Sequence, residues 1–264
     1  MIKRYSKLFI TLLKFKLSAR LVYSYDFWSA FFADSMLFFV QLLTFSAIFS
    51  HVEQVNGWTI NEVIVFIGTF TLIDGLTMAT YFFGVITLPE KIRTGRLDIY
   101  ITKPVNTLFY STHDSMSPGS FMVCIAGIIM VLYGASKMGI EFSFGLLFGY
   151  IFLALMMFIL MFSLSVILRS VAFWFVRIDS LMEIENQLIE FAFRVPGVVY
   201  KGFMKIILWV VLPYGLIATI QTQLLAGMMD PKTWLFVITI TVTFFTIAVL
   251  LFKKGLSVYS SASS

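Results

Sequence analysis

Residues 172–195 form a weakly apolar segment that carries an unusual line of polar side chains. They recur at spacings of four, three and four, which would place them on one face of a helix: Asp179, Glu183, Asn186 and Glu190. A charge at the centre of a bilayer costs on the order of 2.5–3.5 kcal/mol even on insertion scales. This face is therefore expected to meet protein or water rather than lipid.

Two interpretations of this stripe stay open. In the structural one, its carboxylates pair with cations of this chain or of a partner, and Glu190 with Arg194 is the local i, i+4 candidate. In the functional one, the stripe gives a transport path a negative lining that suits a cationic or amphipathic substrate such as a peptide or drug. Asp74, in the middle of an apolar run, joins the same candidate set, although nearby Thr, Tyr or backbone groups would equally satisfy it.

Other chemistry is missing from the sequence. It has no G-x-x-x-x-G-K-[ST] loop to hold phosphates, and its two histidines, His51 and His113, are expected on opposite sides of a membrane, too far apart for a shared metal site. We find no Ser–His–Asp or Cys–His set, so we expect neither an enzyme active site nor a metal. The net charge of +5 indicates positive-inside bias rather than nucleic-acid binding.

Residues 88–114, LPEKIRTGRLDIYITKPVNTLFYSTHD, form the longest polar interruption. Basic loops stay on the cytoplasmic side, and this one holds four cations: Lys91, Arg93, Arg96 and Lys103. Glu90 to Ile101 is predicted as one short helix that ends before Lys103-Pro104, because the residue before a proline is pushed out of the α region. One side of this helix would be apolar, with Ile92, Leu97 and Ile101. A cytoplasmic partner could bind such a helix and, by pushing on it, move the two spans that it connects.

The elements that position these residues follow from composition. With 264 residues, 59% of them hydrophobic and 12% charged, and a mean hydropathy of +0.94, the chain is predicted to be an all-α polytopic membrane protein with one transmembrane domain over 1–264. Apolar runs long enough for a ~30 Å hydrocarbon core predict six spans: 27–50, 62–86, 117–134, 144–168, 172–195 and 234–252. Ser117-Pro118 would open the third, as N-cap and first helical residue.

Residues 1–22 hold six cations and predict an amphipathic helix in the inner headgroup region, with membrane lipids as its partner. Its polar stripe comprises Lys3, Lys7, Thr11, Lys14 and Ser18. No small-residue cleavage site follows the first apolar run, so we expect no removable signal peptide.

Residues 196–228 are predicted to be a re-entrant region, because Pro213 breaks the apolar stretch from Met204 to Leu225. If this stretch turns back inside the outer leaflet, fourteen of the 19 lysines and arginines fall on the cytoplasmic side. The positive-inside rule then favours six spans with both termini inside. Such a hairpin is tolerated only where protein covers it or where it lines a cavity.

Four stretches carry a resemblance to a known family, one of them being VPGVVYKGFMKIILWVVLPYGLI (195–217). TGRLDIYITKPVNTLF (94–109) matches a loop pattern G-x-L-D-x-Y-[LI]-x-[KR]-P-x-N, and AFWFVRIDSL (172–181) and LLFKKGLSVYSSAS (250–263) add further matches. Together they resemble the ABC-2 type transporter permeases, in a subfamily of uncharacterised bacterial ABC permeases. Val195-Pro196 stands where that subfamily usually has Tyr-Pro, and Ile220-Gln221-Thr222 stands where it often has Tyr-Tyr-Pro.

The resemblance implies a non-catalytic membrane subunit of an exporter of a lipidic, peptide or drug-like substrate in the bacterial plasma membrane. It implies a cytoplasmic ABC ATPase dimer that carries ATP and Mg, no cofactor in this chain, and a second permease, expected to be a different chain, against spans two and five. The 88–114 loop would be the coupling loop, contacting the ATPase through a defined set: Glu90, Arg93, Arg96, Leu97 and Asp98. Two rival functions are a membrane scaffold without an ATPase and a proton-driven secondary transporter that uses Asp74 and the stripe carboxylates.

Overall fold

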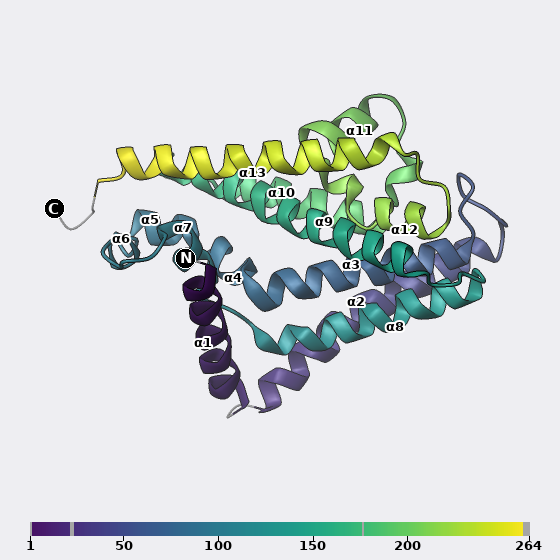
Figure 1. Ribbon diagram of the computed structural model, residues 1–264, viewed down its shortest axis with the longest axis horizontal. Coiled ribbons are helices and arrows are strands. Elements are labelled where there is room, and N and C mark those ends of the chain that lie inside the picture. The colour runs from purple at the N-terminus through teal and green to yellow at the C-terminus, as the bar shows by residue number, and fades with distance from the viewer. Residues whose placement is uncertain (1, 22–23, 176, 261–264) are drawn as a thin grey trace.

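The computed structural model describes residues 2–21, 24–175 and 177–260, and the regular secondary structure of this part of the chain is helical, with no strand. Most long helices run along one axis, and the N-terminal helix stands across them (Figure 1). The long helices are α1 (Ile2–Leu21), α2 (Ser24–Phe49), α3 (Ile60–Thr80), α8 (Phe121–Lys137), α9 (Phe144–Ser170), α10 (Asp179–Arg194) and α13 (Lys232–Val258). The predicted all-α class is therefore confirmed.

Four helical stretches of the described residues are long and apolar enough to cross a membrane: Ile60–Thr80, Pro118–Lys137, Phe144–Phe173 and Lys232–Val258. A fifth would be added if the helix pair Gly202–Val211 and Pro213–Leu225 formed one span. The two helices of this pair are bent by 86° relative to each other. The bend lies at the predicted break, Pro213. Within the described part of α2, Phe38–Phe49 is a shorter apolar helix.

Helices α3 and α8 pack antiparallel through glycines spaced seven residues apart on each helix. A Cβ at Gly68 would lie 2.8 Å from the Val131 nitrogen, and one at Gly127 would lie 2.6 Å from the Leu72 nitrogen. Gly75 and Gly134 make equally close contacts farther along. The two backbones therefore touch, which fixes α3 as a buried central helix.

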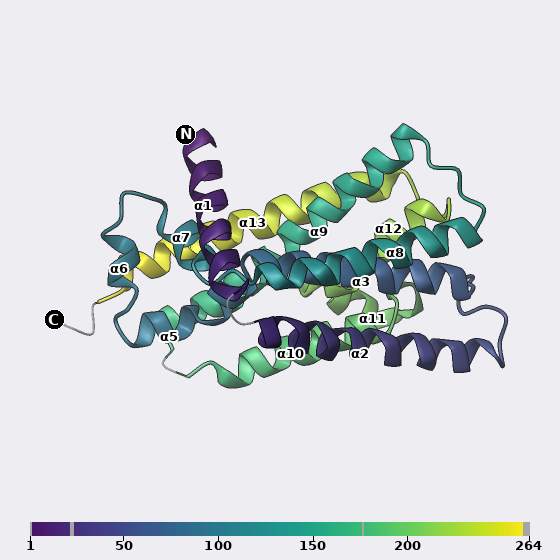
Figure 2. The same cartoon turned by 90° about the horizontal axis from the view of Figure 1, so that it is seen from below.

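The core divides into two main clusters. In the larger one, α3, α9 and α13 pack with the bent region, and Leu153, Tyr214 and Ile217 are almost fully buried. The second cluster joins the start of the coupling loop to the C-terminal half of α13. The loop and the end of α13 therefore lie at the same end of the bundle, as Figure 2 also shows.

The N-terminal helix has the predicted amphipathic arrangement. The side chains of its polar stripe are all exposed, while Tyr5, Leu8 and Phe9 are partly covered. Lys16, which lies on the opposite side of the helix from the stripe, is half-buried. The side chain of Arg20 lies outside the described residues. The helix also packs on the coupling loop, because the Tyr5 and Phe109 rings lie 5.2 Å apart and the Asn106 amide donates to the Tyr5 hydroxyl.

The predicted helix over 172–195 starts too early. After α9, a short 3₁₀ turn spans Val171–Phe173, and α10 begins only at Asp179. Val195 leaves the helical region with φ −124° and ψ 111°, because Pro196 follows it. The remaining 16 residues are too polar to qualify as an apolar span.

The prediction of one coupling helix from Glu90 to Ile101 is also wrong. The segment consists of α5 (Leu88–Arg93) and α6 (Asp98–Ile101), and Gly95 between them has φ +75°, a left-handed conformation that favours glycine. A third short helix, α7 (Thr107–His113), follows. The turn directs Leu97 into the core at 0% exposure, whereas Ile101 is 44% exposed.

The other helix ends shift by smaller amounts. The second predicted span is α3 followed, after a break at Tyr81, by α4 (Phe82–Ile86). Ser117 precedes a 3₁₀ turn over Pro118–Ser120, but its side chain makes no capping hydrogen bond. The region that is predicted to be re-entrant, residues 196–228, contains η3 (Gly197–Val199), α11 (Gly202–Ile206), η4 (Ile207–Val211), η5 (Pro213–Leu216) and α12 (Thr219–Leu225).

Candidate functional site

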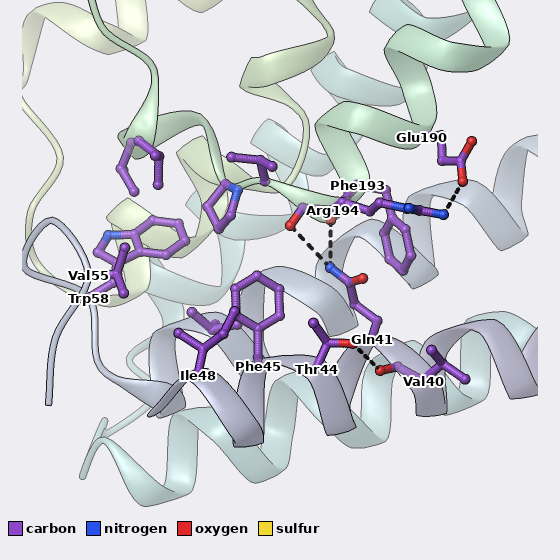
Figure 3. A pocket seen from close by; sticks show the side chains of 15 residues that line it. Val40, Gln41, Thr44, Phe45, Ile48, Val55, Trp58, Glu190, Phe193 and Arg194 are labelled. Atoms are coloured by element: carbon purple, nitrogen blue, oxygen red, sulfur yellow. Dashed lines mark hydrogen bonds and ion pairs between the residues drawn. The ribbon is translucent and has the colours of Figure 1, made fainter. Parts of the chain in front are cut away.

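A cavity of about 530 Å³ opens between α2, the 50–59 turn and the C-terminal end of α10, and we call it the Trp58 cavity (Figure 3). Its walls are mostly apolar, and Trp58 and Phe45 are buried, with 1% and 8% exposure. The exposed side chains of Val40 and Ile48 stand at its rim on α2. Volumes of ~300–1,000 Å³ with few polar groups are typical of ligand sites.

Gln41 fixes the position of α2 against α10. It is 7% exposed, and its Nε2 donates to the carbonyl oxygens of Phe193 at 3.2 Å and Arg194 at 3.3 Å. These carbonyls belong to the last turn of α10, which has no further helical N–H to bond. The amide therefore satisfies the helix end and forms one wall of the cavity, as Figure 3 shows.

A second cavity of about 220 Å³ adjoins the first, and we call it the Asp74 cavity. Its polar lining groups are Asp74, Thr77, Tyr81, Ser165, Asn186 and Glu190. The other described lining residues are apolar, and neither a lysine nor an arginine is among them. This cavity lies between α2, α3, α4, α9 and α10, so it depends on helices from most of the chain.

Phe193 separates the two cavities. It lines both of them, as does Glu190. Its ring centroid lies 5.6 Å from that of Phe38 and 5.0 Å from that of Phe70, so an aromatic group from α10 meets partners on α2 and α3. Phe193 and Glu190 therefore both lie at the boundary between an apolar and a more polar space.

The structure brings together three of the five residues predicted for a pathway or interface: Asp74, Asn186 and Glu190 line the Asp74 cavity. Asp179 and Glu183 lie elsewhere, both exposed. The predicted Glu190–Arg194 pair is confirmed, with both side chains more than half exposed. The stripe is thus one helical face of which only part reaches a cavity.

A buried charged cluster on α9 and α10 was not predicted. Glu185 accepts hydrogen bonds from Ser165 Oγ and Tyr214 Oη, both at 2.9 Å, and forms an ion pair with Arg169. Arg169 lies in the last turn of α9, yet its side chain is only 2% exposed. The one available signal was that Glu185 is a carboxylate off the polar stripe of its helix, so it must point at another surface.

A second unpredicted cluster holds the coupling loop together. Lys91 is 5% exposed, and its Nζ donates to the Ser111 carbonyl at 2.7 Å and to Asp114 Oδ1 at 2.8 Å. Tyr100 donates to the other oxygen of Asp114, and its ring lies 5.0 Å from the Lys91 ammonium. Burial lowers the pKa of Lys91 and Asp114 opposes this effect, whereas burial and Asp114 both raise the pKa of Tyr100.

The residues predicted to contact an ATPase lie at this end of the bundle. Glu90 and Arg96 form an exposed ion pair, Arg93 is exposed and Asp98 is half-buried. Leu97 is buried inside the chain, so the prediction that it faces a partner is wrong. Its role in the loop is that of a core anchor, together with Leu88 and Ile92.

A cleft of about 360 Å³, which we call the Arg177 cleft, joins this loop to the start of α10. Glu90 and Arg93 line it from α5, and Arg177, Asp179 and Met182 line it from the other side. The coupling loop therefore faces the same helix that borders both cavities. Movement of α5 toward α10 would reach the cavity walls through one rigid helix.

Among the described residues, no group of three or more His, Cys, Asp or Glu side chains could hold a metal ion. Comparison with known proteins then gives one match: a family model described as ABC-2 family transporter protein covers residues 36–263. No curated protein and no solved structure matches significantly.

Proposed function

Because the chain belongs to the ABC-2 transporter family, we propose that it is the membrane subunit of an exporter driven by separate cytoplasmic ATPase subunits. The match over residues 36–263 confirms the resemblance of the loop and of the C-terminal stretch. Membership of this family makes the chain a multi-pass, non-catalytic membrane protein. It also implies a cytoplasmic ABC ATPase partner. Export, the lipidic, peptide or drug-like substrate, and the ATP and Mg bound by the partner are the proposed refinements.

The observation that carries the proposal is the construction of the coupling loop. Lys91 and Leu97 are buried and hold α5, α6 and α7 as one unit, while charged side chains of α5 remain exposed. Rigid elements with exposed charges transmit a push better than a mobile loop does. ATP-driven closure of the ATPases would press on this unit and, across the Arg177 cleft, shift α10.

We propose six passages through a bacterial plasma membrane, with both termini on the cytoplasmic side. Two contacts support this topology: α1 packs on the coupling loop, and the C-terminal half of α13 packs in the same cluster as Leu97. Helices α2 and α10 would be the first and fifth passages. The bent region would then be a re-entrant hairpin. Such a hairpin has to be covered by protein or line a cavity, and the Pro213–Ile220 segment is buried within the protein.

A second permease completes the proposed assembly, and we expect it to be a different chain. Asp179, Glu183 and Asn186 are exposed on α10, and carboxylates beside apolar spans need protein or water against them. A partner that carries basic groups at this face would satisfy these carboxylates better than the same acidic face of a second copy. A purified complex with a single permease sequence and two-fold symmetry would replace this with a homodimer.

The test uses the complex with the ATPase subunits that co-purify in mild detergent. Replacement of Arg93, Arg96 and Asp98 together by alanine should abolish the stimulation of ATPase activity by transport while leaving membrane insertion intact. Lys103→Ala, which removes an exposed cation of the same loop, is the matched control and should leave stimulation unchanged. Normal coupling in the triple variant would refute the proposed contact.

A proton-driven secondary transporter is the second candidate, because Asp74 and Glu190 line one cavity. Transport that collapses with an uncoupler but survives ATP depletion would favour it. Export that follows ATP and tolerates the uncoupler would exclude it. A complex with no ATPase subunit and no transport would instead support a scaffold.

A further inference from the structure

We propose that the Asp74 cavity binds the positively charged head of a lipophilic organic cation and that the Trp58 cavity takes its apolar remainder. This deepens the proposed function, on which it rests, by naming the substrate class. The two cavities adjoin along α10, one mostly apolar and the other lined by carboxylates and aromatic rings. An amphiphile has the same two-part character.

The walls of the Asp74 cavity have the chemistry that recognises an amine or a quaternary ammonium. They include two carboxylates, Asp74 and Glu190, and five aromatic residues: Phe38, Phe70, Tyr81, Phe82 and Phe193. Aromatic faces attract cations, by ≈ 2 kcal/mol or more when the cation is desolvated. Carboxylates alone would suit many cations, but the added rings favour an organic one.

The charge balance of the site points the same way. Glu190 already pairs with Arg194, and Arg194 lines the Trp58 cavity but not the Asp74 cavity (Figure 3). The described residues that line the Asp74 cavity include the carboxylates of Asp74 and Glu190 and no cationic side chain. An anionic head would lie against these carboxylates, so an anion is disfavoured.

The Trp58 cavity suits the apolar remainder. Its volume of about 530 Å³ exceeds that of the Asp74 cavity, and Phe45, Trp58 and Val63 supply a buried apolar floor. Apolar space that stays unfilled forfeits dispersion contacts on its lining. The exposed rim at Val40 and Ile48 lies on an apolar face of α2 that includes Phe39 and Leu43, so an apolar chain can reach it from lipid.

Phe193 decides whether one molecule can occupy both spaces. Its ring packs against Phe38 and Phe70 at the boundary that it shares with Glu190, and we expect rotation of this ring to widen the connection between the cavities. A smaller residue should open the boundary permanently. The occupant would then be held less selectively, because one of the five aromatic walls is removed.

The test measures equilibrium binding to the full chain in lipid nanodiscs, with two probes of equal chain length: radiolabelled dodecyltrimethylammonium and dodecyl sulfate. We expect saturable binding of the ammonium probe and at least about tenfold weaker binding of the sulfate. Asp74→Asn should weaken the ammonium probe by about tenfold or more, and Phe193→Leu should weaken it less. Equal affinity for the two probes would overturn the proposal, because equal affinity is what non-specific partition of both alkyl chains into an apolar surface would give.

Glu183→Gln is the matched control, because it removes an exposed carboxylate of α10 that lines neither cavity. If Asp74→Asn fails to fold, Glu190→Gln supplies the same comparison from the opposite wall. Unchanged ammonium affinity in the folded carboxylate variants would also overturn the proposal. The binding assay contains no ATPase, so its outcome is independent of ATP-driven export. If the protein binds the ammonium probe but its complex shows no ATP-driven export, the proposed function is refuted and the proposed binding site is retained.

Discussion

Arg169 on α9 and Glu185 on α10 form an ion pair in which both side chains are almost fully buried, at 2% and 0% exposure. Glu185 also accepts from Ser165 and from Tyr214 of the bent region. One carboxylate therefore ties together α9, α10 and the segment after Pro213. Helix α10 borders both cavities and the Arg177 cleft. The ion pair therefore sets the position on α9 of the helix that the proposed mechanism shifts.

Breaking the buried pair from one side should be strongly destabilising. Glu185→Gln or Arg169→Met leaves one desolvated charge without its partner, which costs about 3–5 kcal/mol, and the thermal unfolding transition in nanodiscs should fall accordingly. Arg194→Gln breaks the exposed Glu190–Arg194 pair and should cost ~0–1 kcal/mol. The double variant Arg169→Met with Glu185→Leu should recover part of the loss. A Glu185→Gln protein as stable as the wild type would contradict this account.

The Lys91 cluster should set the rigidity of the coupling loop. Lys91→Met keeps the bulk of the side chain but leaves Asp114 without its cation, so α5 and α7 should separate more easily. Limited trypsin cleavage at Arg93 and Arg96 should accelerate, and ATPase stimulation should fall. Lys103→Met removes an exposed cation and should change neither readout. Unaltered cleavage in Lys91→Met would show that Leu97 and its apolar neighbours suffice.

The contact between α3 and α8 should tolerate no side chain at Gly127. A Cβ there would lie 2.6 Å from the Leu72 nitrogen and 2.7 Å from the Gly68 oxygen, so Gly127→Val must separate two backbones. Overpacking of this kind costs about 1–3 kcal/mol or more. Gly145 on α9 has open space around it, and Gly145→Ala should change stability by less than about 1 kcal/mol. Equal unfolding transitions for the two variants would refute this.

Stability should decline in mild acid because of His113. Burial lowers the pKa of this imidazole from its ordinary 6.5 to about 4, despite the Phe109 carbonyl and Asp114 nearby. The folded state therefore favours the neutral ring, and its stability, fully present above pH 6.5, is lost as the pH falls toward 4. His113→Phe should keep the stacking on the Phe109 ring, whose centroid lies 4.5 Å away. The unfolding temperature of this variant should depend less on pH between 6.5 and 4 than that of the wild type. Identical pH profiles would assign the decline to other groups.

The sequence alone determined the class of protein and much of the helix plan. Long apolar runs predict α3, α8, α9 and α13 because only a helix satisfies its own backbone in lipid. Pro196 ends α10 and Pro213 marks the bend, since proline constrains the residue before it and removes a donor. The spacing in the first 22 residues gave the exposed and covered faces of α1. Each of these depends on local chain geometry.

The tertiary structure decided which polar residues are buried and what they meet. Periodicity puts Asp179, Glu183, Asn186 and Glu190 on one face, but it does not indicate that Asn186 and Glu190 reach a cavity with Asp74 more than a hundred residues earlier. Glu185 meets Arg169 sixteen residues back and Tyr214 29 residues ahead. Leu97 is buried because Gly95 turns the chain and α13 arrives to cover it. Such contacts join segments distant in sequence, so their partners are fixed only when the whole bundle packs.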